Sequence, residues 1–337
     1  MQDRTLRLST KCDPGHILTC TAQRFEQVDK AKLGSEMKAL ITGGSGFIGS
    51  WIAKALMARG FQIKSFDIKT DLSVPKEILD KDTDKVEWVS GDITDAASLA
   101  DAARNCDLLV HLAAILTPDC ARDPVRGAEI CLIGSLNVFE AAKQHGIKRI
   151  LYMSSAGVFG PEDDGVYPRP TTLYGAYKLA VEGAARAYWN DHGISSVGFR
   201  PLIVYGPGRE TGLTAGPSIA CKAAAQGDDY IIPFSGDTDF IYVSDVAEAY
   251  AAASVKEQPG AHVYNIVGDL GSAQDFAEEI MRAAPGASVR AEGPGLPIAP
   301  QIDAGTLRQD FPDIPRTTIR EGVSETVAHY RKGRNTR

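Results

Sequence analysis

An apolar run that leads directly into a glycine-rich turn constrains the fold of this chain more than any other feature. Residues 37–49 read Met-Lys-Ala-Leu-Ile-Thr-Gly-Gly-Ser-Gly-Phe-Ile-Gly. In such a pattern Gly43 permits a tight turn after a buried strand, Gly46 allows a diphosphate to approach the backbone, and Gly49 lets the next helix pack closely on the strand. The run therefore predicts a strand, a turn and a helix that bind a dinucleotide.

The segments that follow support this interpretation. A helix is expected over 48–59, and the N–H groups at its start, those of Phe47 and Ile48, would point at the phosphates. The next apolar strand, 62–66, leads to Asp67. This residue could simply be a turn residue at a strand end, but its carboxylate could also bind both hydroxyls of an adenosine ribose. Because it would repel the 2′-phosphate of NADP, the sequence predicts NAD as the cofactor.

Composition limits the classes of protein to which the chain can belong. It has 337 residues, 44% of them hydrophobic, which suits one large domain or two closely connected ones. The net charge of -7 gives no basic surface for nucleic acid or anionic membranes, and no apolar run approaches the roughly 18 residues of a membrane span. The six cysteines are scattered, without metal-ligand spacing. We therefore expect reduced thiols, no metal and a cytoplasmic protein.

Residues 1–36 differ from the rest of the chain because they show no sustained apolar period. They lack the apolar segment of a signal peptide, and their acidic residues argue against a transit peptide. We expect a poorly ordered N-terminal extension, with Met37 a plausible natural start.

Beyond the first unit, short apolar strands alternate with helical stretches such as 133–145 and 174–191, which is typical of a parallel sheet covered by helices on both faces. We predict an α/β fold with a doubly wound (Rossmann) sheet. Its expected strands are 38–42, 62–67, 86–90, 108–112, 149–154, 196–202 and 262–266.

Glycine and proline enrichment after residue 205 predicts a smaller C-terminal substrate-binding lobe. We assign 37–205 and 240–268 to the NAD-binding Rossmann domain, and 206–239 and 269–337 to this discontinuous lobe.

Ligands of such sheets bind beyond the carboxyl ends of the strands. One crevice should therefore be lined by Asp92, Ala113, Ala114, Ser155 and the loop after Leu202.

A tyrosine and a lysine four residues apart follow a strand that ends in two serines. Tyr174 and Lys178 fall on one face of the predicted helix, and an ammonium about 4 Å from a phenol would lower the pKa of the phenol by about three units. Tyr174 could then exchange a proton with an alcohol, while Ser155 holds the same oxygen. His111, at the end of an apolar strand, is interpreted as a packed structural histidine.

Together these segments resemble an extended short-chain dehydrogenase/reductase of the NAD-dependent epimerase/dehydratase family. The resemblance covers about residues 37–330. It is carried by the motifs at 42–49, 91–92, 111–114, 134–138, 154–160, 174–178, 204–208 and 239–246.

The resemblance implies that Tyr174 is the acid/base, that Lys178 also binds the nicotinamide ribose and that Ser155 orients the substrate oxygen. It also implies a homodimer formed through the helices that flank Tyr174. The implied cofactor contacts are Gly43, Gly46, Phe47, Ile48, Gly49, Asp67, Asp92, Ile93, Leu112, Ala113, Ala114, Tyr174 and Lys178.

The chain departs from the family's sugar-nucleotide members at several positions. Ile203 replaces their usual asparagine and Thr238 their usual arginine, and neither can anchor a diphosphate as an arginine does. Cys131 replaces another asparagine. Ala156-Gly157 stands where dehydratases of this fold carry an Asp-Glu pair, which argues against elimination of water as the reaction.

The main hypothesis is an NAD-dependent oxidoreductase that interconverts a secondary alcohol and a ketone on a small polar substrate, such as a sugar derivative, polyol or hydroxy acid. Arg209, with Thr211, Thr214 and Ser218, is the predicted substrate-recognition group. Two alternatives stay open: a sugar or sugar-nucleotide epimerase that retains its NAD, and a catalytically idle NAD sensor.

Overall fold

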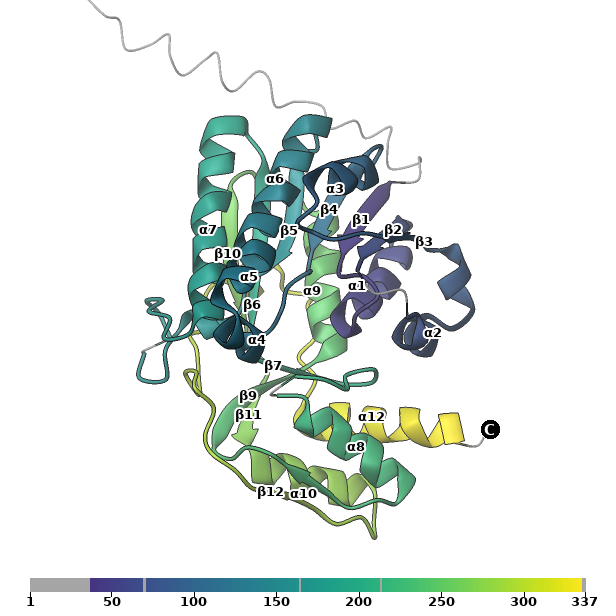
Figure 1. Ribbon diagram of the computed structural model, residues 1–337. Coiled ribbons are helices and arrows are strands. Elements are labelled where there is room, and N and C mark those ends of the chain that lie inside the picture. Colours follow the sequence, from purple (N-terminus) through teal and green to yellow (C-terminus); the bar gives the residue numbers. More distant parts are fainter. Residues whose placement is uncertain (1–36, 69–70, 164, 213, 335–337) are drawn as a thin grey trace, which may run out of the picture. The chain divides into compact units, whose positions relative to one another are not determined.

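Seven parallel strands form the central sheet of the described residues, in the order β10-β6-β5-β4-β1-β2-β3 (Figure 1). Every neighbouring pair in this sheet is parallel. The strands are β1 (Lys38–Thr42), β2 (Gln62–Asp67), β3 (Glu87–Ser90), β4 (Leu108–His111), β5 (Arg149–Met153), β6 (Ser195–Pro201) and β10 (Ala261–Ile266). The predicted doubly wound α/β fold is confirmed, and each predicted strand end lies within one residue of the observed one.

The computed structural model describes residues 37–337 except 69–70, 164, 213 and 335–337. The predicted N-terminal extension, 1–36, with its two cysteines, lies outside the described residues.

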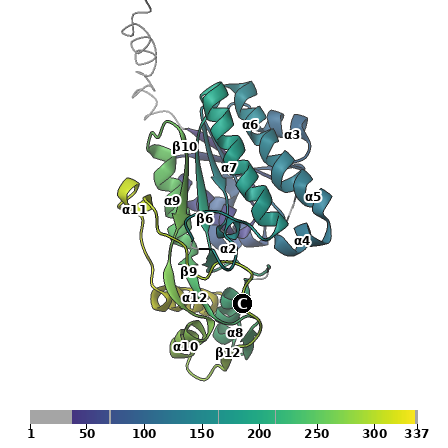
Figure 2. The same ribbon diagram turned by 90° about the vertical axis from the view of Figure 1, so that its left-hand side faces the viewer.

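Alternation along the strands places apolar side chains on both faces of the sheet. In β1, Ala39 and Ile41 belong to one buried cluster and Leu40, between them, belongs to another. The first cluster includes residues of α1 (Phe47–Met57) and α9 (Val243–Val255), and the second includes residues of α3 (Ala96–Ala103), α6 (Gly134–His145) and α7 (Leu173–His192). Helices therefore cover both faces, as Figure 2 shows for α3, α6 and α7 on one face and α9 on the other.

Shorter elements connect the strands. They are α2 (Ser73–Leu79), η3 (Asp80–Lys85), α4 (Thr117–Arg122), α5 (Pro124–Ala128), a π-helical turn η4 (Glu129–Ile133) and a 3-10 turn η5 (Ala156–Val158).

The strand order reverses between β1 and β4, because the chain first adds β2 and β3 on one side and then returns to add β4 on the other. At this reversal the loops after β1 and β4 diverge, and ligands of such sheets bind there. The glycine-rich turn follows β1, and Leu112 to Ala114 follow β4.

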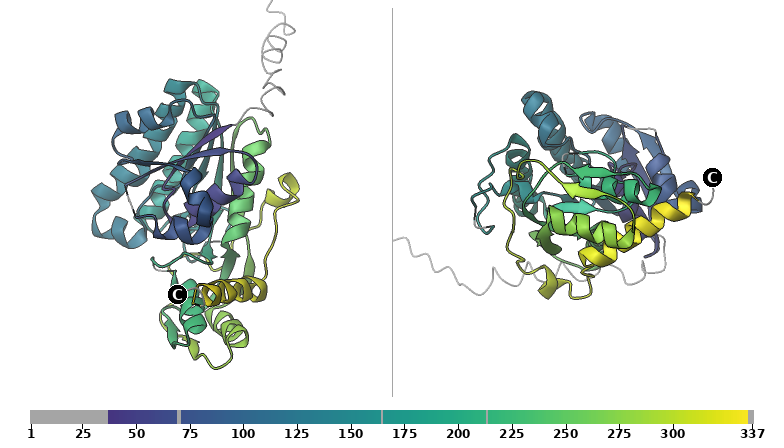
Figure 3. Two further views of the ribbon diagram at one scale, coloured as in Figure 1. Left: turned by 90° about the vertical axis from the view of Figure 1, so that its right-hand side faces the viewer. Right: turned by 90° about the horizontal axis from the view of Figure 1, so that it is seen from below.

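Apart from α11, which lies beside β10 (Figure 2), the remaining elements lie beyond the carboxyl ends of the central strands, below the sheet in Figure 1. They include a three-stranded sheet in the order β11-β9-β7 and a pair of strands, β12 and β8. The helix α12 packs against α8 and α10, and its yellow ribbon is clear in both views of Figure 3. These elements are β7 (Ile203–Tyr205), α8 (Gly216–Gln226), β8 (Tyr230–Ile232), β9 (Asp237–Tyr242), β11 (Asp269–Ser272), α10 (Ala273–Ala283), β12 (Val289–Ala291), α11 (Leu307–Asp310) and α12 (Ile319–Arg334).

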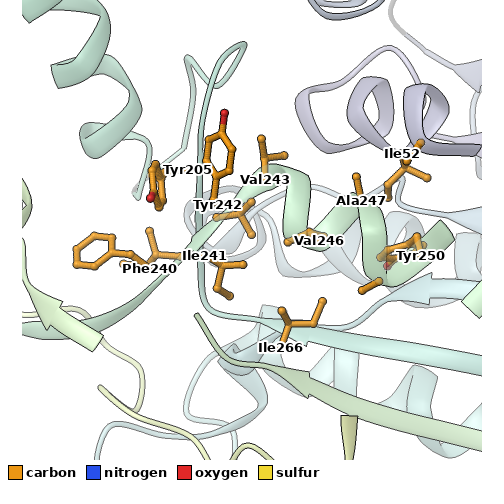
Figure 4. Packing of buried hydrophobic residues seen from close by; sticks show 14 of the residues in the cluster. Ile52, Tyr205, Phe240, Ile241, Tyr242, Val243, Val246, Ala247, Tyr250 and Ile266 are labelled. Carbon is orange, nitrogen blue, oxygen red and sulfur yellow. The ribbon is translucent and has the colours of Figure 1, made fainter. Parts of the chain in front are cut away.

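A continuous core joins these elements to the central sheet. α9 begins directly after β9, and the buried Phe240 and Tyr242 of β9 belong to the same cluster as Tyr250 of α9 and Ile266 of β10 (Figure 4). Tyr205 of β7 packs edge-on against Phe240, with ring centroids 6.4 Å apart. The start of the loop that follows β7 is therefore anchored in this core. None of the described helices is both long and apolar enough to cross a membrane.

Candidate active site

The glycine-rich turn between β1 and α1 is pressed against the segment that follows β4. Gly43 has a φ of +74°, which glycine adopts without strain, and its N–H donates to the carbonyl oxygen of Phe66 at 2.9 Å. A Cβ atom on Gly43 would lie only 2.9 Å from the backbone nitrogen of Ala113. The turn and the predicted cofactor contact Ala113 are thus side by side.

The two later glycines serve different purposes. A Cβ on Gly49 would lie 2.4 Å from the carbonyl oxygen of Gly43, so Gly49 allows the helix to pack on the turn itself rather than on the strand. A Cβ on Gly46 would meet only the same oxygen, at 3.3 Å, among the described residues. Gly46 is also the N-cap of α1, so no side chain at this position caps the helix start. The N–H groups of Phe47 and Ile48 lack carbonyl partners within the helix, so this open helix start fits a diphosphate.

Asp67, the last residue of β2, is tied to the same turn. Its Oδ2 accepts hydrogen bonds from the Ser45 hydroxyl at 2.6 Å and from the Ser45 backbone N–H at 3.2 Å. The carboxylate is therefore fixed beside the turn, where it can bind ribose hydroxyls of a dinucleotide whose diphosphate lies at α1.

Asp92 and Ile93 follow β3. One Asp92 oxygen accepts from the Thr94 N–H at 2.9 Å and the Thr94 hydroxyl at 2.8 Å, and the other pairs with Arg126 at 3.0 Å. The hydrogen bonds from Thr94, with those from Arg126, lower the pKa of Asp92. Asn137 donates to the Ile93 carbonyl oxygen at 3.0 Å. Asp92 is thus a fixed anion, and its contact with adenine stays a prediction.

His111, at the end of β4, is buried and hydrogen-bonded at both ring nitrogens. Nδ1 lies 2.8 Å from the Thr42 hydroxyl and Nε2 lies 2.8 Å from the Ser135 hydroxyl. Burial lowers the pKa of His111 to about 3, so the ring is neutral. This is the structural histidine predicted from the sequence, and it fixes β4 to β1 just before Leu112 and Ala114.

Ser155, Tyr174 and Lys178 come together although they lie in different elements. The Gly157 N–H donates to the Ser155 hydroxyl at 3.0 Å, which closes the η5 turn. A Cβ on Gly175 would lie 2.0 Å from the Gly157 carbonyl oxygen, so the first turn of α7 is pressed directly onto η5. A Cβ on Gly157 would lie 3.2 Å from the Ser155 hydroxyl oxygen and 3.7 Å from Cδ1 of the Tyr174 ring, so both side chains border the same turn.

Lys178 lies one helical turn after Tyr174. Its Nζ donates to the Met153 carbonyl oxygen at 2.7 Å and lies 5.5 Å from the centroid of the Tyr174 ring. The side chain is 3% exposed. The predicted set of three residues is therefore assembled at the carboxyl end of β5.

The sequence predicted a lowered pKa for Tyr174, and this prediction is wrong for the protein without bound NAD. Burial raises the pKa of Tyr174, and the nearby Ser155 hydroxyl opposes this only in part. Burial also lowers the pKa of Lys178. The sequence argument considered the charge of Lys178 and left out the cost of removing a phenolate from water.

An ion pair missed by the sequence analysis lies directly behind these residues. Glu182 is one turn beyond Lys178 on the same face of α7 and accepts a hydrogen bond from Ser154 at 2.5 Å. Its carboxylate also accepts two hydrogen bonds from Arg200 of β6, at 2.7 and 2.5 Å. The Arg200 guanidinium stacks over Phe159, 5.2 Å from the ring centroid. The spacing of four residues after Lys178 was the available signal for Glu182.

Two cysteines also lie near the site. The Sγ atoms of Cys120 and Cys131 are 4.0 Å apart, and both side chains are fully buried. Burial and, to a smaller extent, the neighbouring Cys131 raise the pKa of Cys120 to about 12, so its thiol stays protonated at neutral pH. Within the described part of the chain, no group of three or more His, Cys, Asp or Glu residues could hold a metal ion.

The predicted substrate residues in and after the loop that follows β7 differ in their exposure and their hydrogen bonds. Arg209 donates to the Val204 carbonyl oxygen and, at 2.7 Å, to the Thr214 hydroxyl. Ser218 is fully buried and accepts a hydrogen bond from the Gly206 N–H at 3.1 Å, so it supports the loop. Thr211 is exposed to solvent.

The side chains of Ile203 and Thr238, two of the departures from the sugar-nucleotide members, are buried in the protein. Ile203 is fully buried and Thr238 is 3% exposed, in a strand that pairs with β11. Neither side chain is free to bind a diphosphate.

A seven-stranded parallel sheet, a glycine-rich turn and an assembled Ser-Tyr-Lys set define a dinucleotide-dependent short-chain dehydrogenase/reductase of the extended type. Residues 39–267 match the family model described as "NAD dependent epimerase/dehydratase family". The chain belongs to this family, and its cofactor is NAD.

Relatives extend over most of the chain. The UDP-glucose 4-epimerase of Mycolicibacterium smegmatis is 27% identical over 319 residues, which cover 88% of this chain and 99% of the relative. The dTDP-glucose 4,6-dehydratase of an Actinoplanes species is 28% identical over 331 residues, 89% of this chain and 99% of the relative.

Solved structures share the fold. The UDP-glucose 4-epimerase of Thermus thermophilus, in complex with NAD, superposes with a TM-score of 0.76 at 27% identity, covering 88% of this chain and 99% of that one. The L-threonine dehydrogenase of Cupriavidus necator has a TM-score of 0.75 at 24% identity, covering 86% and 99%, and shows the likeness of fold alone. The family thus includes NAD-dependent enzymes of several activities.

Proposed function

We propose that this protein is an NAD-dependent dehydrogenase/reductase that interconverts a secondary alcohol and a ketone on a small polar substrate. Sugar derivatives, polyols and hydroxy acids are the candidate substrates. The observation that carries the proposal is the assembly of Ser155, Tyr174 and Lys178 beyond the carboxyl end of β5.

Each of the three residues has a role in moving one proton. The Ser155 hydroxyl binds the substrate oxygen and the Tyr174 hydroxyl accepts or returns its proton. The Lys178 ammonium stabilises the phenolate form of Tyr174, and it is also positioned to bind the nicotinamide ribose. NAD, when bound, supplies the hydride acceptor and a positively charged ring that further favours the phenolate.

The turn after Ser155 bears on the type of reaction. Ala156 and Gly157 are both buried, and neither carries an acid or base. This supports oxidation or epimerisation over dehydration, which needs an additional acid and base.

The alternative is an epimerase for a sugar or sugar nucleotide that keeps its NAD through each turnover. It is favoured by the relatives, several of which are named as epimerases. The buried Ile203 and Thr238 favour the first proposal, since they remove two polar anchors for a diphosphate.

Cofactor retention and NADH formation distinguish the two functions. We would measure NAD in the purified full chain by mass spectrometry, then assay sugars, polyols and hydroxy acids for NADH absorbance. A dehydrogenase forms NADH in proportion to added substrate. Epimerisation of a sugar nucleotide without added NAD, with no net NADH, would instead establish the alternative.

Gly46→Ala tests the cofactor site. The backbone at Gly46, with φ -78° and ψ 176°, accommodates alanine, so the variant should fold. The added methyl group occupies the open helix start, and we expect the Kd for NAD to rise by about tenfold or more through lost phosphate hydrogen bonds. Gly183→Ala is the matched control, because its Cβ would meet nothing closer than Arg186 at 3.9 Å. Equal NAD affinity in both variants, measured by calorimetry, would contradict this assignment.

We further propose that the protein is a cytoplasmic homodimer, and that 206–239 and 269–337 form its substrate-binding lobe. Light scattering after size-exclusion chromatography would report a mass twice that of the 337-residue chain.

A further inference from the structure

Arg209 is a fixed cation in the loop that follows β7. One guanidinium nitrogen donates to the Val204 carbonyl oxygen and another donates to the Thr214 hydroxyl at 2.7 Å. These two anchors lie on opposite sides of the turn at Gly206 to Gly208, so the side chain is folded back toward the end of the strand. Its planar group is preorganised rather than free in solvent.

The loop that carries Arg209 closes against the segment after β4. Gly212 has a φ of +103°, and a Cβ there would lie 2.9 Å from Leu116 and 3.8 Å from the Arg209 guanidinium. Leu116 begins α4, which packs against the α7 helix that carries Tyr174. Arg209 and the helix that carries Tyr174 therefore both adjoin the segment around Leu116 and α4. Burial raises the pKa of Tyr174, and the positive charge of Arg209 is among the influences that oppose this shift.

The described residues provide no counter-ion for the charge of Arg209. Among the described residues, every hydrogen bond of its guanidinium goes to a neutral acceptor, and none of their carboxylates forms an ion pair with it. Arg200, by contrast, is paired through two hydrogen bonds with Glu182. Burial lowers the pKa of Arg209 to about 10, which leaves it protonated at neutral pH. A half-buried cation that has no counter-ion among the described residues is costly unless a ligand supplies the negative charge.

We infer that Arg209 binds a carboxylate of the substrate, so that the protein acts on small hydroxy acids in preference to neutral sugars and polyols. The inference rests on the proposed function and names the substrate class of the same site. A carboxylate is favoured over a diphosphate for two reasons. The single positive charge of Arg209 balances one negative charge, and its planar guanidinium matches a planar anion in shape.

Paired probes with the same carbon skeleton test this inference. We would titrate the NAD-saturated full chain by calorimetry with glycerate and glycerol, threonate and threitol, and gluconate and glucitol. At least one acid should bind about 10- to 100-fold more tightly than its polyol, the range expected for charge-assisted hydrogen bonds. Arg209→Gln should abolish that difference, and Arg209→Lys should retain part of it.

The controls separate a lost subsite from a damaged fold. Arg290→Gln, at an exposed arginine whose side chain is 59% accessible, should leave every affinity unchanged. Arg209→Gln should still bind NAD and keep its far-ultraviolet circular dichroism. Equal affinity for acid and polyol in every pair would overturn the inference. So would an Arg209-dependent preference for UDP-glucose over all the acids, because that outcome identifies a phosphate site.

Binding and turnover give independent answers. Arg209-dependent binding of an acid without NADH formation would leave the carboxylate site standing and would overturn the proposed dehydrogenase function. NADH formation from a polyol, with no Arg209-dependent acid binding, would do the reverse.

Discussion

Replacement of Tyr174 by phenylalanine should lower kcat by about 10²- to 10⁴-fold, the usual contribution of a positioned general acid or base. In the proposed function, the phenol hydroxyl is the group that exchanges a proton with the substrate. Affinity for NAD should change little, because Lys178 and the glycine-rich turn are untouched. Steady-state kinetics with the substrate found in the NADH screen would measure the effect, and calorimetry would measure NAD binding.

Tyr177→Phe is the matched control. It removes a hydroxyl from the same helix that donates to the Pro124 carbonyl oxygen at 2.8 Å. We expect nearly normal turnover from this variant. If Tyr174→Phe were equally active, Tyr174 would have no role as acid/base, and the NAD-sensor alternative would gain support.

The pH dependence follows from the same residues. Burial raises the pKa of Tyr174, so alcohol oxidation should become faster as the pH rises and the phenolate forms. The Lys178 ammonium lies 5.5 Å from the centroid of the Tyr174 ring, and we expect it to favour the phenolate. Lys178→Met should therefore move the profile to higher pH as well as lower the rate. An unshifted profile would show that the charge of Lys178 does not act on Tyr174.

The second large effect concerns stability. Glu182→Ala should destabilise the protein by about 3–5 kcal/mol, because it leaves the largely buried Arg200 without its counter-ion. Urea unfolding followed by circular dichroism would measure the change. The side chains of Glu182 and Arg200 are 1% and 13% exposed, so solvent does little to screen their interaction.

An exposed ion pair provides the comparison for this prediction. Asp101 and Arg104 pair at 2.8 Å with side chains 75% and 61% exposed, and Asp101→Ala should cost no more than about 1 kcal/mol. The double variant Glu182→Leu with Arg200→Met should recover most of the loss, since it leaves no unpaired charge. A Glu182→Ala variant as stable as Asp101→Ala would mean that water reaches Arg200.

The cofactor half of the fold could be predicted because its signals are local. The turn at Gly43, Gly46 and Gly49 depends on backbone space, and strand, turn, helix and Asp67 follow one another within thirty or so residues of sequence. The central strands were predictable for the same reason, since each is a short apolar run bounded by turns.

Features that depend on pairing across the chain could not be predicted. β7 has three residues, and only its pairing with β9, more than thirty positions later, identifies it as a strand. The contact of Glu182 with Arg200 joins a helix to a strand, and no local period indicates it. The pKa of Tyr174 was misjudged because desolvation depends on the whole surrounding structure, whereas the position of Lys178 follows from helical spacing alone.

Three successive turns of α7 carry a proton-exchanging phenol, a cation and an anion, at Tyr174, Lys178 and Glu182. In the proposed function, one helix therefore carries the acid/base and its neighbouring charges, while Arg209 binds the substrate from a separate loop after β7. A change of loop sequence could then redirect the enzyme to a new molecule without disturbing proton transfer. We therefore expect that substitutions within residues 206–215 change substrate selectivity, while α7, left constant, keeps proton transfer.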